Sequence, residues 1–155
     1  MDAPIISPNE VKTEDQIIIG IGDNNIRKEI KNKLGTVKYG VAIHRTVIVG
    51  SNCYFGLGTV AFAGVIVNAG SIIGNHVILN TNCSVDHHCV IEDFVHVSPG
   101  ATICGGVKIK EGVHIGAGAV VLPNLTIGKG ATIGAGAVVI SDISANKTVV
   151  GVPAK

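Results

Sequence analysis

The sequence lacks the large aromatic side chains on which many small cores depend. It contains no tryptophan, two tyrosines and three phenylalanines among 155 residues, so a core wedged by aromatic rings is not expected. It also lacks a run of 18 apolar residues and a signal-peptide pattern at its start, which predicts a single cytoplasmic domain. No CxxC pair occurs, which favours reduced thiols over disulfides or zinc ligands; the cysteines are Cys53, Cys83, Cys89 and Cys104.

Charge is low overall and uneven along the chain. The formal net charge is +1, and binding to nucleic acid needs a basic surface to neutralise phosphates. Residues 61–96 carry three acidic and no basic side chains, whereas residues 97–155 carry five basic and two acidic ones. We therefore expect neither nucleic acid nor a membrane as a partner.

Glycine, by contrast, is abundant, and it marks an internal repeat of six residues. Every sixth residue from position 43 to position 139 is apolar, and the residue four places later is small or apolar. This period fits neither the helical 3.6 nor simple strand alternation. It fits a short β segment followed by a turn, with three segments closing a coil of 18 residues. The prediction is an all-β fold, a parallel β-helix over residues 43–144, with residues 145–155 as a C-terminal tail.

The fourth position of each repeat predicts the corners of these coils. It is usually Gly, Asn or Asp, which tolerate the positive φ of a sharp corner. The exceptions are Thr46, His76, His88 and Phe94. Because places where local rules fail are candidate functional sites, these corners are of interest. Histidine also enters the left-handed region readily, so His76 and His88 can equally be tolerated corners.

Residues 1–42 lack the six-residue repeat, and their pattern predicts a partial αβ unit. We expect a buried strand over residues 17–21, a turn at Gly22 and a helix that begins at Asp23 or Asn24. The apolar face of this helix would carry Ile26, Ile30 and Leu34. A helix directly after a glycine turn can bind phosphate, but a plain capping unit explains the same pattern.

Residues 84–100 concentrate histidine and acidic side chains. They include His87, His88, His96, Asp86, Glu92 and Asp93. The 18-residue coil stacks His87 between Ala69 and Gly105 and stacks His88 between Gly70 and Gly106. The two imidazoles would thus project into a groove nearly bare of side chains. His96 belongs to another column, with Ile78, His114 and Thr132.

This arrangement favours base catalysis of acyl transfer. Attack by an amine or hydroxyl on an acyl carbonyl needs a group that removes a proton, and neutral imidazole does this near pH 7. A carboxylate on its far nitrogen would fix the tautomer, and Asp86, Glu92 and Asp93 are candidates. Backbone amides of the coils could bind the oxyanion. Surface histidines at loop corners remain the alternative interpretation.

The repeats resemble those of a known enzyme family. Residues 79–139, which begin LNTNCSVDHHCVIEDFVHVSPG, and the final VVGVPAK are similar to hexapeptide-repeat acetyltransferases that modify sialic acid or UDP-linked 4-amino-6-deoxy sugars. IIIGIGDNNIRKEI extends the resemblance over most of the chain. It implies a left-handed parallel β-helix, a homotrimer, and direct transfer from acetyl-CoA without an acyl-enzyme.

The resemblance also implies roles for individual residues. His87 would accept the proton, with His88 and Asp86 beside it. The acetyl-CoA contacts would be His96, Gly105, Ala117 and Ala135, in a cleft between subunits, and Gly22 would touch the nucleotide of the sugar substrate. No metal is expected, because zinc-binding β-helices of the carbonic anhydrase type use a pair of histidines five residues apart and this sequence has no such pair.

Two departures from the family pattern leave a competing hypothesis. Relatives usually have Glu or Asp after the catalytic histidine, where this chain has His88, so the base should be less polarised unless Asp86 or Asp93 substitutes. Relatives also begin with a complete βαβ unit that holds UDP, and this chain starts after that unit would have ended. The alternative to a sugar acetyltransferase is therefore a non-catalytic β-helix scaffold or an inactive truncated relative.

Overall fold

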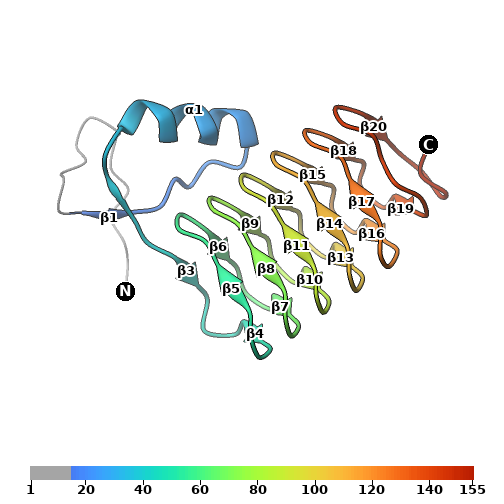
Figure 1. Cartoon of the computed structure of the whole chain (residues 1–155), viewed down its shortest axis with the longest axis horizontal. Coiled ribbons are helices and arrows are strands. Elements are labelled where there is room, and N and C mark those ends of the chain that lie inside the picture. The colour runs from blue at the N-terminus through green and yellow to red at the C-terminus, as the bar shows by residue number, and fades with distance from the viewer. Residues whose placement is uncertain (1–14) are drawn as a thin grey trace.

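The computed structural model describes residues 15–155, and its main body is a solenoid of short parallel strands (Figure 1). The first 14 residues of the predicted αβ region lie outside the described residues. Each strand of the solenoid is two residues long and pairs in parallel with a strand of the next coil. Ser84, for example, is in register with Ile66 and Thr102. The predicted fold class is confirmed.

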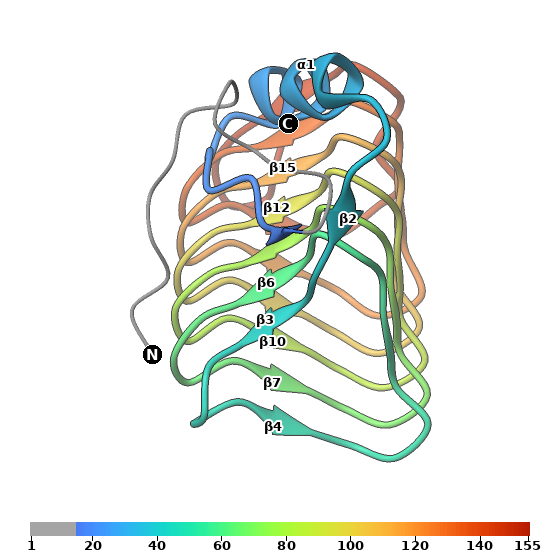
Figure 2. The same ribbon diagram turned by 90° about the vertical axis from the view of Figure 1, so that its left-hand side faces the viewer.

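Three sheets form the faces of a prism, which Figure 2 shows end-on. Face 1 contains β3 (Ala42–Ile43), β6 (Val60–Ala61), β9 (Ile78–Leu79), β12 (His96–Val97), β15 (His114–Ile115), β18 (Thr132–Ile133) and β20 (Thr148–Val149). Face 2 contains β4 (Ile48–Val49), β7 (Ile66–Val67), β10 (Ser84–Val85), β13 (Thr102–Ile103), β16 (Val120–Val121) and β19 (Val138–Val139). Face 3 contains β5 (Tyr54–Phe55), β8 (Ile72–Ile73), β11 (Val90–Ile91), β14 (Lys108–Ile109) and β17 (Thr126–Ile127). β20 lies within the segment predicted as a tail.

Aliphatic ladders fill the prism, as the repeat predicts. The ladder under face 3 consists of fully buried isoleucines, namely Ile73, Ile91, Ile109 and Ile127. Removing each such side chain from water stabilises the fold by about 1.5–3 kcal/mol. Cys83 and Cys89 point into the same core, and all four cysteines are free thiols. Burial raises the pKa of Cys83 to about 12, so this thiol is unreactive at neutral pH.

Most corners adopt the left-handed backbone that the fourth repeat position predicts, although Thr46 and Asp142 do not. The unusual corner residues His76, His88 and Phe94 have φ values of 53°, 56° and 57°. They lie on two different edges of the prism. His88 lies on the edge between faces 2 and 3 (edge 2–3), whereas His76 and Phe94 lie on successive coils of the edge between faces 3 and 1 (edge 3–1).

The N-terminal unit consists of β1 (Gln16–Ile17), α1 (Asn24–Leu34) and β2 (Lys38–Tyr39), with β1 and β2 paired in parallel. Asp23 caps α1, as predicted, because its carboxylate accepts bonds from the N–H groups of Asn25 and Ile26, both at 2.9 Å. The predicted strand over residues 17–21 is shorter and starts earlier. No helix within residues 15–155 is long and apolar enough to cross a membrane.

The predicted apolar face of α1 is only partly buried, since Ile30 and Leu34 are half-buried. Arg27 is the buried residue of this helix, at 1% exposure, whereas Ile26 is 47% exposed. The helix lies along one side of the solenoid (Figure 1), where backbone carbonyls of the corners face it. A guanidinium with five donors satisfies such carbonyls, and an aliphatic stripe cannot.

Candidate active site

His87 and His88 lie together on edge 2–3, and both are exposed. Their Nδ1 atoms are 3.0 Å apart, and the rings are nearly perpendicular, with an interplanar angle of 76°. The predicted glycine neighbours are what leave room for the rings. A Cβ on Gly105 would lie 2.7 Å from His87 Cε1, and one on Gly70 would lie 3.0 Å from His88 Cδ2. Each ring therefore occupies the space over a glycine, on opposite sides of its own coil.

The three candidate carboxylates do not orient the His87 ring. Asp86 Oδ1 accepts bonds from the backbone N–H of His87 at 2.8 Å and from Asn68 Nδ2 at 3.0 Å, and these bonds lower its pKa. Glu92 binds Lys110, and Asp93 binds the backbone and side chain of Asn75. The ring hydrogen bond of His87 goes instead to His88.

His96 lies on face 1, across the prism from His87, and it contacts the N-terminal unit. Its Nδ1 is 3.1 Å from the carbonyl oxygen of Gly22, and its Nε2 is 3.1 Å from Asn80 Nδ2. An amide NH₂ only donates and a carbonyl only accepts, so His96 is the neutral tautomer with its proton on Nδ1. Burial lowers the pKa of His96, and the nearby His114 and Arg27 act in the same direction. The ring therefore stays neutral near pH 7.

A pocket of about 250 Å³ opens between the N-terminal unit and face 1. Most of its wall is apolar, and its polar groups gather where Gly22, Asn80 and His96 meet. The apolar wall is formed by Ile18, Ile19, Gly20, Val60, Phe62 and Ile78. The pocket thus joins Gly22 and His96, which the sequence analysis assigned to different ligands. Asn80, which fixes the His96 tautomer, was missed because a lone asparagine carries no motif.

Arg27 fastens the N-terminal unit against edge 3–1. Its guanidinium donates to the carbonyl oxygens of His76 and Phe94 and to those of Ile21 and Gly22, and also to Asn24 Oδ1. Burial lowers the pKa of Arg27 to about 10, which leaves it charged at neutral pH. The arginine therefore holds the Gly22 turn in place beside His96.

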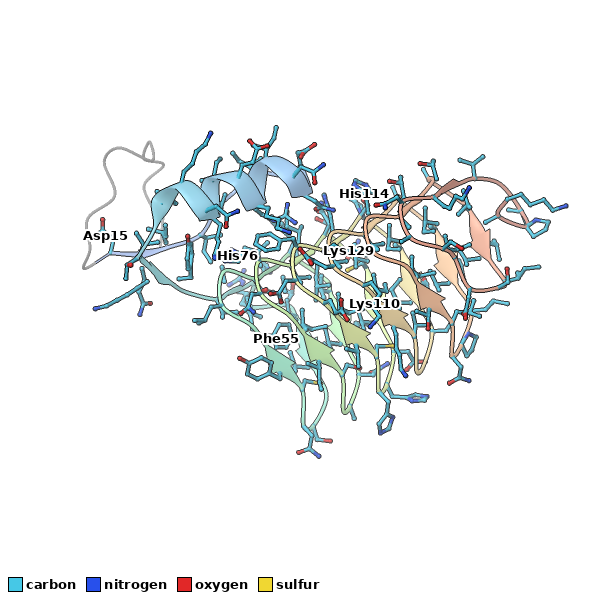
Figure 3. All side chains as sticks on the ribbon, turned by 45° about the horizontal axis from the view of Figure 1, so that its top comes forward. Asp15, Phe55, His76, Lys110, His114 and Lys129 are labelled. Atoms are coloured by element: carbon cyan, nitrogen blue, oxygen red, sulfur yellow. The ribbon has the colours of Figure 1, made fainter. Side chains whose placement is uncertain are left out.

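The unusual corners His76 and Phe94 belong to this docking surface. Their rings stack with centroids 5.0 Å apart, and Tyr39 meets His76 edge-on at 4.5 Å. Lys28 of α1 lies over the Phe94 ring, 5.7 Å from its centroid. Figure 3 shows His76 between the helix and the coils. These two exceptions to the corner rule therefore serve packing, whereas His88 does not.

The remaining predicted residues lie on separate parts of the prism. Gly105 lies against the His87 ring on edge 2–3. Ala117 and Ala135 are exposed on successive coils of the edge between faces 1 and 2, where the N–H of Gly136 bonds to the carbonyl of Ala117. Within one chain, Ala117 and Ala135 therefore lie away from His87, and only Gly105 contacts it. Within residues 15–155, no group of three His, Cys, Asp or Glu side chains is placed to hold a metal ion.

Comparison with known proteins finds sequence and structural relatives. Residues 88–123 and 106–141 match the family model described as bacterial transferase hexapeptide (six repeats). The acetyltransferase domain of PglB from Neisseria gonorrhoeae FA1090, solved in complex with acetyl coenzyme A, is 41% identical with a TM-score of 0.90. That match covers 96% of this chain and 74% of the PglB domain.

Two further structures are similar over nearly the same length. A variant of perosamine N-acetyltransferase from Caulobacter crescentus, in complex with CoA and GDP-perosamine, is 36% identical with a TM-score of 0.88, over 90% of this chain and 68% of that one. WeeI from Acinetobacter baumannii AYE is 29% identical with a TM-score of 0.88, over 96% of this chain and 73% of that one.

Proposed function

The chain belongs to the hexapeptide-repeat acetyltransferase family, and from this premise we propose that it transfers the acetyl group of acetyl-CoA to an amino group of a nucleotide-linked sugar. Two of these relatives support this choice, since one was solved with acetyl coenzyme A and another, an N-acetyltransferase, with CoA and GDP-perosamine. A sialic acid or another hydroxyl acceptor is less well supported by these relatives.

The geometry of His87 carries the proposal. Its ring is exposed over Gly105, and its Nδ1 is engaged by His88. When His87 donates from Nδ1, the lone pair of Nε2 is free to accept a proton. In the proposed reaction, the sugar amine attacks the thioester carbonyl while its proton passes to His87 Nε2. The C–S bond then breaks, and the proton returns to the departing CoA thiolate.

The pocket beside Gly22 is the proposed site of the sugar nucleotide. Its apolar wall suits a deoxy sugar ring, while Gly22, Asn80 and His96 offer polar groups at one end. Arg27 holds this turn through the carbonyl oxygens of Ile21 and Gly22 and does not line the pocket. The predicted contact of His96 with acetyl-CoA places the thioester at the same end, near the amine that it must meet.

A homotrimer would complete the site. His87 lies on edge 2–3 and the pocket lies on face 1, so the two halves meet only when the edge of one subunit approaches the face of another. Exposed apolar side chains flank both halves, and they support such packing. Ile66 and Ile72 are 37% and 49% exposed beside edge 2–3, and Phe62 is 46% exposed at the pocket.

The test follows thiol release from acetyl-CoA with UDP- and GDP-linked 4-amino-6-deoxy sugars. We expect acceptor-dependent release by the wild type and a loss of about 10²- to 10⁴-fold in kcat for His87→Ala. The matched control is His44→Ala, which removes another exposed histidine far along the solenoid. If the two variants release thiol equally fast, His87 is not the base. If the wild type neither binds acetyl-CoA nor releases thiol, the scaffold interpretation replaces the enzyme.

A further inference from the structure

The bond between His87 and His88 joins two nitrogens of the same kind. Only one proton fits between two Nδ1 atoms 3.0 Å apart, so one ring donates and the other accepts. When both rings are neutral, the donor ring has a free Nε2 and the acceptor ring carries its proton on Nε2. His87 can therefore act as a base only while it is the donor.

The two rings diverge from this shared bond. His87 Nε2 lies on the Gly105 side of the coil and His88 Nε2 on the Gly70 side. The titratable groups around the pair are Asp86, which interacts electrostatically with His87, and the thiols of Cys89 and Cys104, which both interact with Asp86. Asp86 is engaged by a backbone N–H and by Asn68, and burial raises the pKa of Cys104, which keeps that thiol neutral. His88 is thus the group bonded directly to the His87 ring, and it is placed to share charge with that ring.

We propose that His88 takes the positive charge that develops on His87 during transfer, so that the two imidazoles work as one base. This rests on the proposed function. As the C–N bond forms, the amine proton moves to His87 Nε2 and the His87 Nδ1 proton moves to His88 Nδ1. As the C–S bond breaks, His87 Nε2 protonates the CoA thiolate and the shared proton returns to His87. Every proton is accounted for, and both rings end as they began.

The shared proton also predicts how acid inactivates the enzyme. A single proton taken from solution leaves both Nε2 atoms protonated with the third proton between the rings. His87 then has no free lone pair, although only one charge has been added to the pair. The acid limb of the kcat profile therefore reflects one proton bound by two rings.

A matched pair of substitutions separates this role from simple positioning. His88→Asn and His88→Asp both place an oxygen where His88 Nδ1 lies, and neither strains the corner, since Asn52 and Asn124 occupy the same edge at φ 56° and 63°. Asn can accept the bond but cannot hold charge. Asp compensates the charge on His87. The control for the corner itself is Asn52→Gly, two coils away.

We expect His88→Asn to lower kcat about tenfold with an unchanged KM for acetyl-CoA. His88→Asp should recover most of that loss and move the acid limb up by about one pH unit, because a carboxylate favours imidazolium. Asn52→Gly should behave like the wild type. Wild-type kcat in His88→Asn, or equal losses in Asn and Asp, would show that His88 only positions His87. In that result His87→Ala would still be inactive, so the proposed function would stand.

A second measurement does not depend on turnover. In ¹⁵N NMR of the wild type, the Nε2 signals of His87 and His88 should move together over one titration step. Independent titration of the two rings would overturn the proposal. In His88→Asn, His87 should titrate alone.

Discussion

The two edges that carry histidine corners differ in what covers them. On edge 3–1, His76 is 4% exposed beneath the N-terminal unit, in contact with Tyr39 and Phe94. On edge 2–3, His87 and His88 are exposed and bond to each other. The backbone is nearly the same in both places, with φ of 53° at His76 and 56° at His88. A histidine at a corner is therefore not informative by itself, and its surroundings decide its role.

Burial also sets the chemistry of the two edges. Edge 3–1 excludes water, so His76 has a lowered pKa, caused first by burial and then by Lys31 and Arg27, against a smaller opposing effect of Asp93. Edge 2–3 leaves Nε2 of His87 open to an approaching substrate. We infer that edge 3–1 holds the N-terminal unit on the solenoid, and we propose edge 2–3 as the place of the reaction.

Arg27→Leu should have the largest effect, on the docking of the N-terminal unit and not on edge 2–3. The substitution leaves two buried and three partly buried oxygen acceptors without their donor, which should cost about 4 kcal/mol. Hydrogen exchange should show loss of protection in α1 while the solenoid strands stay protected. Glu29→Gln, on the exposed side of the same helix, is the control. Equal protection of α1 in both variants would mean that Arg27 does not fasten the unit.

Gly105→Ala should damage edge 2–3 alone. Its Cβ would lie 2.7 Å from His87 Cε1, so the ring must move, and misplacing a base by about 1 Å costs on the order of a hundredfold in kcat. Gly40→Ala is a matched control because its nearest contact would be at 3.6 Å. Thermal unfolding of both variants should resemble the wild type. A Gly105→Ala enzyme with normal kcat would place the reaction elsewhere.

The repeated parts of the molecule could be predicted, and the parts that occur once could not. The coils, corners and vertical neighbours such as Gly70 and Gly105 follow from a period that the chain repeats many times. The hand of the solenoid did not follow from the period, which is the same for either hand, and came from the family resemblance.

The N-terminal unit shows why single contacts escape sequence analysis. Periodicity placed Ile26 on the apolar face of the helix. The solenoid edge that the helix meets is a row of corner carbonyls, which favours Arg27. Asn80 was missed for the same reason, since its role depends on His96 and Gly22 meeting across the pocket. On edge 2–3, the bare glycine neighbours of His87 could be predicted, whereas its bond to His88 required a structure.

The buried histidine of edge 3–1 should make docking sensitive to acid. The folded pKa of His76 lies below its ordinary value of 6.5, so unfolding of the unit binds a proton. The stabilising contribution is complete above pH 6.5 and is lost as pH falls through the folded pKa. After the intrinsic slowing of exchange in acid is divided out, the protection factors of the α1 amides should fall between pH 7.5 and 5.5.

His76→Asn isolates this contribution, since asparagine accepts the corner geometry. We expect a flatter pH dependence of α1 exchange in the variant. Some dependence should remain, because burial also lowers the pKa values of His96 and His114. An unchanged slope would mean that His76 does not titrate when the unit opens.

Glu111→Gln should have the smallest effect, because it removes only exposed ion pairs. Glu111 pairs with Lys28 of α1 and with Lys129 of the solenoid, and both lysine side chains are largely exposed; Lys129 and Lys110 lie on the coils in Figure 3. Surface pairs contribute little, so the melting temperature should fall by about 2 °C or less. Glu92→Gln is the control, because it breaks a surface pair with Lys110 in which both partners belong to the solenoid. Both differences should shrink in high salt. A drop of many degrees in Glu111→Gln alone would mean that charge, rather than Arg27 and the stacked rings, fastens the N-terminal unit.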